Sequence, residues 1–136
     1  MGIAEPIACL TVPCDAGRLS PNRNRGRHWG DVRRLTATAR LAALAAYLEA
    51  GRPEVEGAVS VAITLRRAAR LDPDSALASC KAVVDGLFRR RDLGHGLTWD
   101  DSAAWLEFAP VRQEIAACWK GREEILIIVT PREETP

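Results

Sequence analysis

The chain has 136 residues, a formal net charge of +1, 47% hydrophobic residues and 27% charged residues. This length predicts one domain, and the composition is that of a globular protein rather than a disordered one. No apolar run approaches the roughly 18 residues of a membrane span, and residues 1–14 lack the basic cluster and apolar run of a secretory signal. We therefore expect a cytoplasmic protein with no membrane partner.

Hydrophobic patterning and turn residues divide the chain into strands and helices. The predicted elements are a strand over residues 7–12 that Pro13 ends, a polar loop over 15–30, a helix that Asp31 caps and that Gly51 and Pro53 stop, a strand over 57–65, a helix over about 74–90, and strands over 104–111 and 124–130. The order β-α-β-α-β-β predicts an α/β (α+β) fold in which a mixed four-stranded sheet packs against two helices.

The predicted helix over 74–90 carries charged residues beside its apolar stripe. At about 100° per residue, the core-facing positions are Leu77, Cys80, Val84, Leu87 and Phe88. Asp74, Lys81 and Asp85 form a narrow band along one edge of that stripe, where we expect them to be half sheltered. A purely structural role is open for each, because Asp74 suits a helix N-cap and Lys81 with Asp85 suits an i,i+4 ion pair.

The cysteines give no sign of a metal or disulfide framework. They are widely spaced and form no C-x-x-C motif, at Cys9, Cys14, Cys80 and Cys118. The only histidines are His28 and His95, which argues against a zinc site. We expect reduced, mostly buried thiols.

Arginines are segregated along the chain. Of 19 basic residues, only Lys81 and Lys120 are lysines. Residues 18–40 hold a single acid, Asp31, among the arginines Arg18, Arg23, Arg25, Arg27, Arg33, Arg34 and Arg40, and further clusters lie at 66–70 and 89–91. A coding preference explains the choice of Arg over Lys but not the clustering. The clustering predicts a basic face that contacts a nucleic-acid backbone.

Carboxylates cluster where the basic segment ends. Asp72 and Asp74 precede a predicted helix that carries Lys81, and a second acidic pair follows at Asp100 and Asp101. Mg²⁺ takes oxygen ligands, usually binds only one or two carboxylates, and completes its shell with water and phosphate oxygens. The pattern predicts a small acidic pocket for Mg²⁺, with Mn²⁺ as the alternative ion, beside a lysine that meets a phosphate.

Three parts of this segment resemble a known family. The chain reads Asp72-Pro73-Asp74-Ser75, then Lys81-Ala82-Val83-Val84-Asp85-Gly86-Leu87, then Trp99-Asp100-Asp101-Ser102. With the Asn- and Arg-rich segment 20–27 upstream, the pattern resembles the RusA-type Holliday-junction resolvases, crossover junction endodeoxyribonucleases common on phage and prophage genomes. The resemblance spans nearly the whole chain. It departs at Ser75, where the family usually has Asn, at the longer interval from Asp74 to Lys81, and in the long glycine-containing stretch 89–98.

The resemblance implies a Mg²⁺-dependent endonuclease that resolves four-way junctions or other branched DNA as a homodimer. By position, it implies metal-binding and catalytic roles for Asp72, Asp74 and Asp101, and a catalytic role for Lys81. The supporting positions around them are Ser75, Asp85 and Asp100. The predicted DNA contacts are Arg23, Arg25, Arg27 and Arg70.

Two other functions stay open. The first is a junction- or DNA-binding protein of the same fold without catalysis, for which Ser75 and the long stretch 89–98 are the signs. The second is a small metal-dependent nucleotide phosphohydrolase. The arginine-rich loop argues against the second, because a mononucleotide offers too few phosphates to need so many arginines.

Overall fold

The computed structural model describes residues 5–20 and 25–132. Its strands are β1 (Ala8–Val12), β2 (Val59–Arg67), β3 (Leu106–Phe108), β4 (Arg112–Ile115) and β5 (Glu124–Pro131). Its helices are α2 (Trp29–Glu49), α3 (Pro73–Ala76), α4 (Lys81–Leu87) and α5 (Arg90–Leu93), with 3-10 turns η1 (Ala16–Leu19), η2 (Ala78–Cys80) and η3 (Ala117–Trp119). No helix in these described parts is long and apolar enough to cross a membrane.

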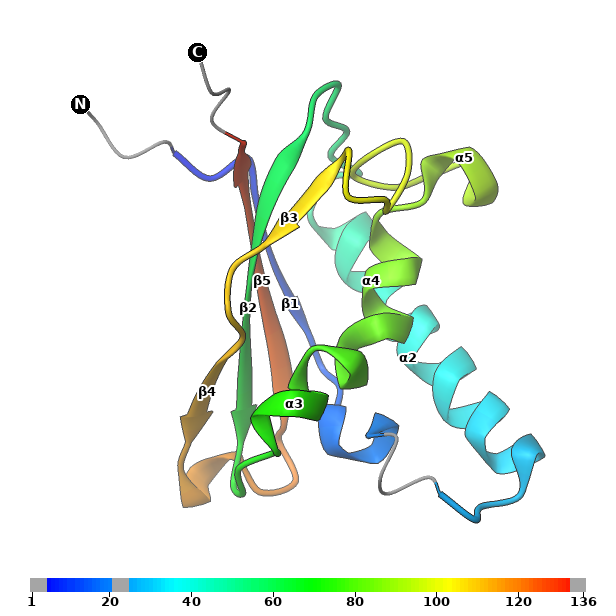
Figure 1. Ribbon diagram of the computed structural model, residues 1–136, viewed down its shortest axis with the longest axis vertical. Coiled ribbons are helices and arrows are strands. Elements are labelled where there is room, and N and C mark those ends of the chain that lie inside the picture. Colours follow the sequence, from blue (N-terminus) through cyan, green and yellow to red (C-terminus); the bar gives the residue numbers. More distant parts are fainter. Residues whose placement is uncertain (1–4, 21–24, 133–136) are drawn as a thin grey trace.

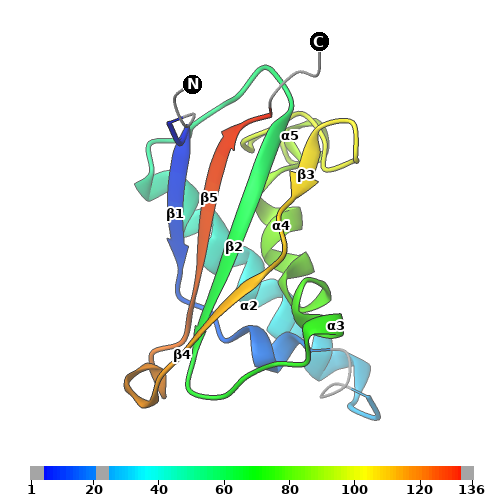
Figure 2. The same cartoon turned by 60° about the vertical axis from the view of Figure 1, so that its left-hand side comes forward.

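The five strands form one mixed sheet (Figures 1 and 2). The strand β5 lies between β1 and β2 and pairs antiparallel with both. On its other side, β2 pairs in parallel first with β3 and then with β4. The α+β class with a mixed sheet is therefore confirmed.

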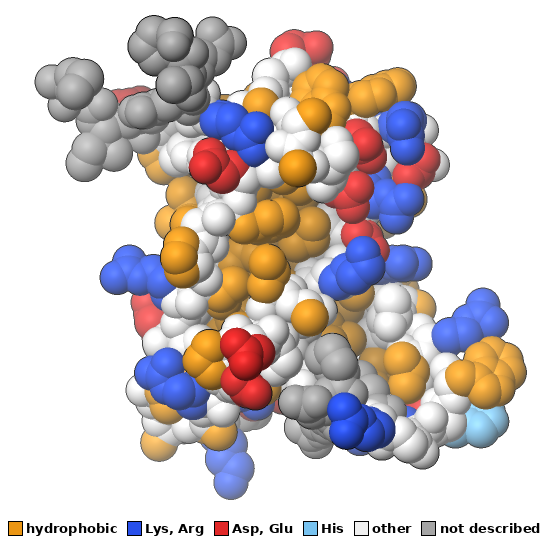
Figure 3. Space-filling view, viewed as in Figure 1, with side chains coloured by type: hydrophobic (Ala, Val, Ile, Leu, Met, Phe, Trp, Pro, Cys, Tyr) orange, Lys and Arg blue, Asp and Glu red, His pale blue; other side chains and the backbone are white. Residues whose placement is uncertain are grey.

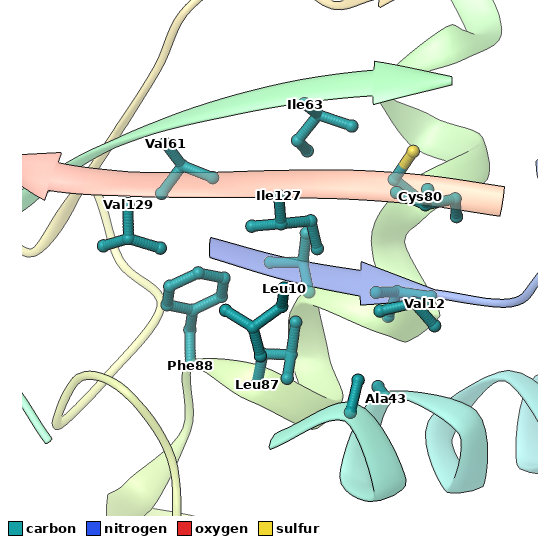
Figure 4. Close-up of a cluster of buried hydrophobic side chains, with 14 of the residues drawn as sticks. Leu10, Val12, Ala43, Val61, Ile63, Cys80, Leu87, Phe88, Ile127 and Val129 are labelled. Atoms are coloured by element: carbon teal, nitrogen blue, oxygen red, sulfur yellow. The ribbon is translucent and has the colours of Figure 1, made fainter. Parts of the chain in front are cut away.

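Helices α2 and α4 pack on one face of this sheet (Figure 1). The strands β2 and β5 alternate buried and half-buried residues, so every second side chain points into the layer between sheet and helices. Figure 4 shows Leu10, Val61 and Ile127 from three strands meeting Leu87 and Phe88 from the end of α4. The buried side chains form one contiguous hydrophobic core.

The predicted strand over 104–111 is longer than the strand observed there. Within that range β3 covers only Leu106–Phe108, and the next strand, β4 (Arg112–Ile115), lies beyond it and was not predicted. Pro110 lies in the gap and has no backbone N–H to donate to a strand ladder. The sheet therefore has five strands rather than the predicted four, with β3 and β4 sharing one edge of β2.

The long helix α2 begins earlier than predicted. Its N-cap is His28, whose Nδ1 accepts a hydrogen bond from the Gly30 N–H at 3.1 Å. Asp31, the predicted cap, lies instead in the first turn, where its negative charge interacts favourably with the positive end of the helix dipole. Its Oδ1 also lies 3.5 Å from Arg34 Nη2. The predicted stop is confirmed, since Gly51 follows the helix with a φ of 88°.

The cysteine prediction is wrong in one respect. All four thiols are free, but only Cys80 is buried; Cys14 is intermediate, and Cys9 and Cys118 are exposed. Burial raises the pKa of the Cys80 thiol to about 12 and that of Cys14 to about 11. Both are therefore protonated, weakly nucleophilic thiols at neutral pH.

Candidate active site

The acidic turn between β2 and α3 is fixed from a distant strand. Gln113 of β4 binds both backbone groups of Leu71: its Oε1 accepts from the Leu71 N–H at 2.7 Å, and its Nε2 donates to the Leu71 carbonyl at 3.0 Å. Asp72 follows as the N-cap of α3, with its Oδ1 accepting from the Asp74 N–H at 3.2 Å. Pro73 then takes the first helical position, which needs no N–H donor. Asp72, not Asp74, is the cap.

The predicted continuous helix over 74–90 is broken, and that expectation is wrong. The hydroxyl of Ser79 donates to the Ser75 carbonyl at 2.8 Å, which competes with the regular helix ladder. The chain forms the 3-10 turn η2 there, and α4 starts afresh at Lys81. The break also explains why Leu77, predicted in the core, is 41% exposed. Cys80, Val84, Leu87 and Phe88 are buried as predicted.

The stretch that carries Asp101 folds back onto the end of α4. The Leu97 N–H donates to the Leu87 carbonyl at 2.6 Å, and the Arg91 N–H donates to the Trp99 carbonyl at 2.9 Å. The buried Thr98 hydroxyl lies 3.2 Å from the Phe88 carbonyl and 3.0 Å from the Asp100 carbonyl. Asp101 thus stands on a stretch whose backbone is hydrogen-bonded to the core.

Gly96 controls this return of the chain, and we expect Gly96→Ala to destabilise the fold by about 1–3 kcal/mol. Its φ is 148°, and an added Cβ would lie 3.0 Å from the Arg90 backbone nitrogen and 3.1 Å from the Leu87 carbonyl oxygen. Gly94 also has a positive φ, of 75°, but open space around its Cβ position. Denaturant unfolding of Gly96→Ala against Gly94→Ala checks this, and an equal loss in both would contradict the steric argument.

A groove of about 440 Å³ opens beside α4. Its charged lining residues are Asp74, Lys81, Asp85 and Asp101, and its other lining residues are Leu77, Ala78, Val84 and Phe108. Figure 3 shows hydrophobic side chains gathered between the β3–β4 edge and the helices, with acidic and basic side chains grouped over α4 and α5. The groove joins an apolar floor to four charged groups.

Asp85 is the most buried of these charged groups, and its side chain is only 9% exposed. Its Oδ2 lies 3.8 Å from Lys81 Nζ on the same helix and 3.8 Å from Arg40 Nη2 on α2. The Lys81 side chain is 77% exposed, so its ammonium group is open to solvent at the groove. The predicted i,i+4 pair is therefore present.

The carboxyl groups of Asp85 and Asp101 line the same groove. Partial burial raises the pKa of Asp101, and the neighbouring Asp85 and Asp100 raise it further, while Arg89 opposes them. Two adjacent carboxylates hold a proton more tightly than one, because ionising both brings like charges together. The same pair also attracts a cation.

The predicted site residues are only partly brought together. Asp74, Lys81 and Asp101 line the one groove, together with Asp85. Asp72 is exposed at the cap of α3 and is not among the groove residues. Ser75 supports the acidic turn, because its hydroxyl donates to the Asp72 carbonyl at 3.2 Å. Asp100 is turned toward Arg91, with Oδ1 and Nη2 4.0 Å apart.

Many arginines of the predicted basic face form ion pairs within the protein, so fewer of them are available to contact a nucleic-acid backbone. Within the predicted arginine clusters, the ion pairs are Arg34 with Asp31, Arg40 with Asp85, Arg66 with Glu114 and Glu124, Arg67 with Asp15, Arg89 with Asp92, Arg90 with Glu54, and Arg91 with Asp92 and Asp100. Arg25, Arg27 and Arg70 are exposed and form no ion pair within the described residues. Arg23 lies outside those residues.

The sequence did not predict the roles of three residues that line the groove or hold its surroundings in place. Gln113 lies 42 positions from Leu71, and nothing in the local pattern signals that contact. Phe108 was predicted only as part of a strand, although its side chain lines the groove. Arg40 is one of a run of arginines, and only the packing of α2 against α4 singles it out.

No protein-family model, curated protein or solved structure matches the chain. Within residues 5–20 and 25–132, no group of three or more His, Cys, Asp or Glu side chains forms a candidate metal cluster. The three-carboxylate set of Asp72, Asp74 and Asp101 is thus not assembled. The groove does contain carboxylates, those of Asp74, Asp85 and Asp101, and carboxylate oxygens are ligands that Mg²⁺ takes from proteins.

Proposed function

We propose that the chain is a Mg²⁺-dependent endodeoxyribonuclease of the RusA type that hydrolyses phosphodiester bonds in four-way junctions and other branched DNA. The observation that carries the proposal is the groove in which Asp101 meets Asp74 and Lys81, although it comes from a separate part of the chain. The Asp-x-Asp, lysine and Asp-Asp pattern of the sequence adds to it. We further propose a homodimer that acts in the cytoplasm.

The groove has the chemistry that phosphodiester hydrolysis needs. The transition state gathers negative charge on its oxygens, so electrostatic stabilisation is the main requirement. The groove carboxylates are the residues that would hold a Mg²⁺ ion, which would supply part of this stabilisation and make water a better nucleophile. Lys81 presents an exposed ammonium group that can hydrogen-bond to the scissile phosphate. Phe108 and Leu77 give the groove an apolar wall against which the DNA excludes water.

Cleavage of a synthetic four-way junction tests the proposal. We expect paired nicks near the branch point in the presence of Mg²⁺, none in EDTA, and little cutting of a linear duplex of the same sequence. Mapping the nicks on a mobile junction gives the preferred cleavage sequence. Metal-independent cutting, or no cutting over a range of Mg²⁺ and Mn²⁺ concentrations, would reject the proposed activity.

A second candidate is a DNA-binding protein of the same fold without catalysis. The position of Asp72 at the helix cap, outside the groove, favours it. This candidate predicts tight junction binding by gel shift with no nick under any metal condition. The same junction preparation therefore separates the two functions.

The proposed backbone contacts are Arg25, Arg27 and Arg70, which are exposed and form no ion pair within the described residues. We expect the triple replacement of Arg25, Arg27 and Arg70 by Ala to weaken junction binding regardless of sequence, and to flatten the slope of log K against log salt by roughly two to three units. Fluorescence anisotropy over a range of salt concentrations measures both. Arg52→Ala, beyond the opposite end of α2, is the control. An unchanged slope in the triple variant would mean that these side chains form an ordinary solvated surface.

A further inference from the structure

We propose that Trp29, at the start of α2, is a stacking platform for an unpaired nucleobase at the branch of the DNA substrate. The inference deepens the proposed function and rests on it for the class of ligand, which is DNA. The DNA contacts described so far are charged side chains that meet phosphate groups, whereas Trp29 would contact a base.

The side chain of Trp29 is held by its neighbours yet open to solvent. The residue is 66% exposed. The His28 ring stacks beside the indole, with centroids 5.6 Å apart and an angle of 27° between the planes, and the Arg33 guanidinium carbon lies 5.6 Å from the indole centroid. These contacts leave most of the ring accessible, and an accessible indole offers a π surface on which a base can stack.

The groups around the indole are suited to the phosphates that accompany a stacked base. His28 is fixed in place, because its Nδ1 accepts the hydrogen bond from the Gly30 N–H. Arg33 is exposed and forms no ion pair within residues 5–20 and 25–132, so its guanidinium group can meet a phosphate while it lies against the indole. Arg25 and Arg27, which precede the helix, are exposed as well. Aromatic rings among such cations are the usual means of binding single-stranded DNA.

A second groove leads from the candidate active site along α2 towards Trp29. This groove, of about 180 Å³, shares Ala78, Lys81 and Asp85 with the groove beside α4, and α2 lines it with Val32, Thr36 and Arg40. Figure 3 shows basic side chains over α4 and, on the same face, hydrophobic, histidine and basic side chains at the N-terminal end of α2.

Helix geometry continues this line to the indole. At 3.6 residues per turn, Trp29 lies within about 20° of both Thr36 and Arg40 around the axis of α2, and roughly 16 Å from Arg40 along it. That length corresponds to roughly five nucleotides at the spacing of duplex DNA. A strand with a phosphate at Lys81 would therefore bring a base a few nucleotides away to Trp29.

Stacking on Trp29 would favour branched DNA over linear duplex. Every base within a duplex already stacks on its neighbours, so exposing one costs a few kcal/mol, whereas an unpaired base at a branch is open at little cost. Phosphate contacts alone do not make this distinction, because linear and branched DNA carry the same backbone.

Anisotropy titrations in EDTA test the assignment without cleavage. The probe is a branched duplex with a short run of unpaired thymines at the branch, and the comparison DNA has abasic residues there, which keep the phosphates but lack the bases. We expect the wild type to bind the thymine DNA at least about fivefold more tightly than the abasic DNA, and Trp29→Ala to bind both equally within about twofold. Trp29→Phe should regain part of the preference.

Leu48→Ala is the matched control, because Leu48 is 50% exposed and lies near the opposite end of α2. It should keep the wild-type preference for thymine DNA. A 2-aminopurine base at one unpaired position reports the stack directly, since its fluorescence falls when it stacks. We expect that quenching at saturating wild-type protein and not with Trp29→Ala. Thermal melts of the variants should match the wild type, because both side chains are exposed.

Three results would each overturn the assignment. They are equal wild-type affinity for the two DNAs, an undiminished preference in Trp29→Ala, and a change of oligomeric state in Trp29→Ala by light scattering, which would place the indole between two copies of the chain. Junction cleavage separates this proposal from the proposed function. Cleavage without a base preference rejects only the stacking role, whereas a base preference without cleavage under any metal condition rejects only the nuclease.

Discussion

The Asp101→Asn variant should lose at least about three orders of magnitude in junction cleavage while it keeps its fold and its DNA affinity. Asp101 belongs to the acidic motif of the sequence and also lines the groove beside α4. Asparagine keeps the size of the side chain but removes the charge that attracts a cation. DNA binding should stay equal or become tighter, because a negative charge facing phosphate is gone.

The same variant should be at least as stable as the wild type at neutral pH. The pKa of Asp101 is raised in the folded protein by partial burial and by Asp85. A raised pKa means that the folded state binds the proton more tightly, so stability falls as pH rises through the folded value. Asn mimics the neutral carboxyl, and its advantage should vanish below the unfolded pKa of about 3.9.

Single-turnover cleavage and melts at several pH values check both halves of this prediction, with Asp31→Asn as the control. A purely structural Asp101 would give the opposite pattern, with normal cleavage and a lower melting temperature. A residual rate within a few fold of wild type would remove Asp101 from the site.

Lys81→Ala should lose at least about two orders of magnitude in cleavage, the scale of removing one donor to transition-state charge. Lys81 lines the groove with Asp85 and Asp101, and its side chain is 77% exposed. An ammonium group is a compact point charge on a flexible stem, whereas a guanidinium group is larger and planar. Lys81→Arg should therefore recover only a small part of the rate.

The chain supplies its own control, because Lys120 is the only other lysine and is exposed in the turn before β5. Lys120→Ala should cut normally. If Lys81 serves only as the partner of Asp85, Lys81→Ala should also cut normally and lose at most about 0.5 kcal/mol of stability. Single-turnover rates at saturating protein, set beside melts of the three variants, distinguish these outcomes.

Local signals predicted most of the fold. The strands β1, β2 and β5 and the helix α2 lie close to their predicted ranges, because apolar periodicity and Gly or Pro stops depend on nearby residues. The start of α2 was missed because an imidazole acceptor, His28, is an uncommon cap. The break at η2 was missed because apolar periodicity continues through Ser79, whose back-bonding hydroxyl opposes a regular helix.

Less of the candidate site could be predicted from the sequence, because contacts between residues far apart in the chain form it. The spacing of Asp74 and Lys81 correctly placed both on one side of the chain. The position of Asp101 at the groove depends on how residues 88–101 return to α4, and backbone hydrogen bonds with no sequence signature determine that path. The clamp of Gln113 on Leu71 is of the same kind.

The backbone bonds between the end of α4 and the stretch before Asp101 also bear on how tightly the groove can hold a ligand. The amide hydrogens of Arg91, Gly96 and Leu97 all donate to acceptors within the fold. They should exchange with solvent slowly, through opening events close in free energy to global unfolding. A loop that is already ordered loses little conformational entropy when a ligand arrives. The backbone that leads to Asp101 is thus ordered before a ligand binds, so little of the binding free energy should be lost in ordering it.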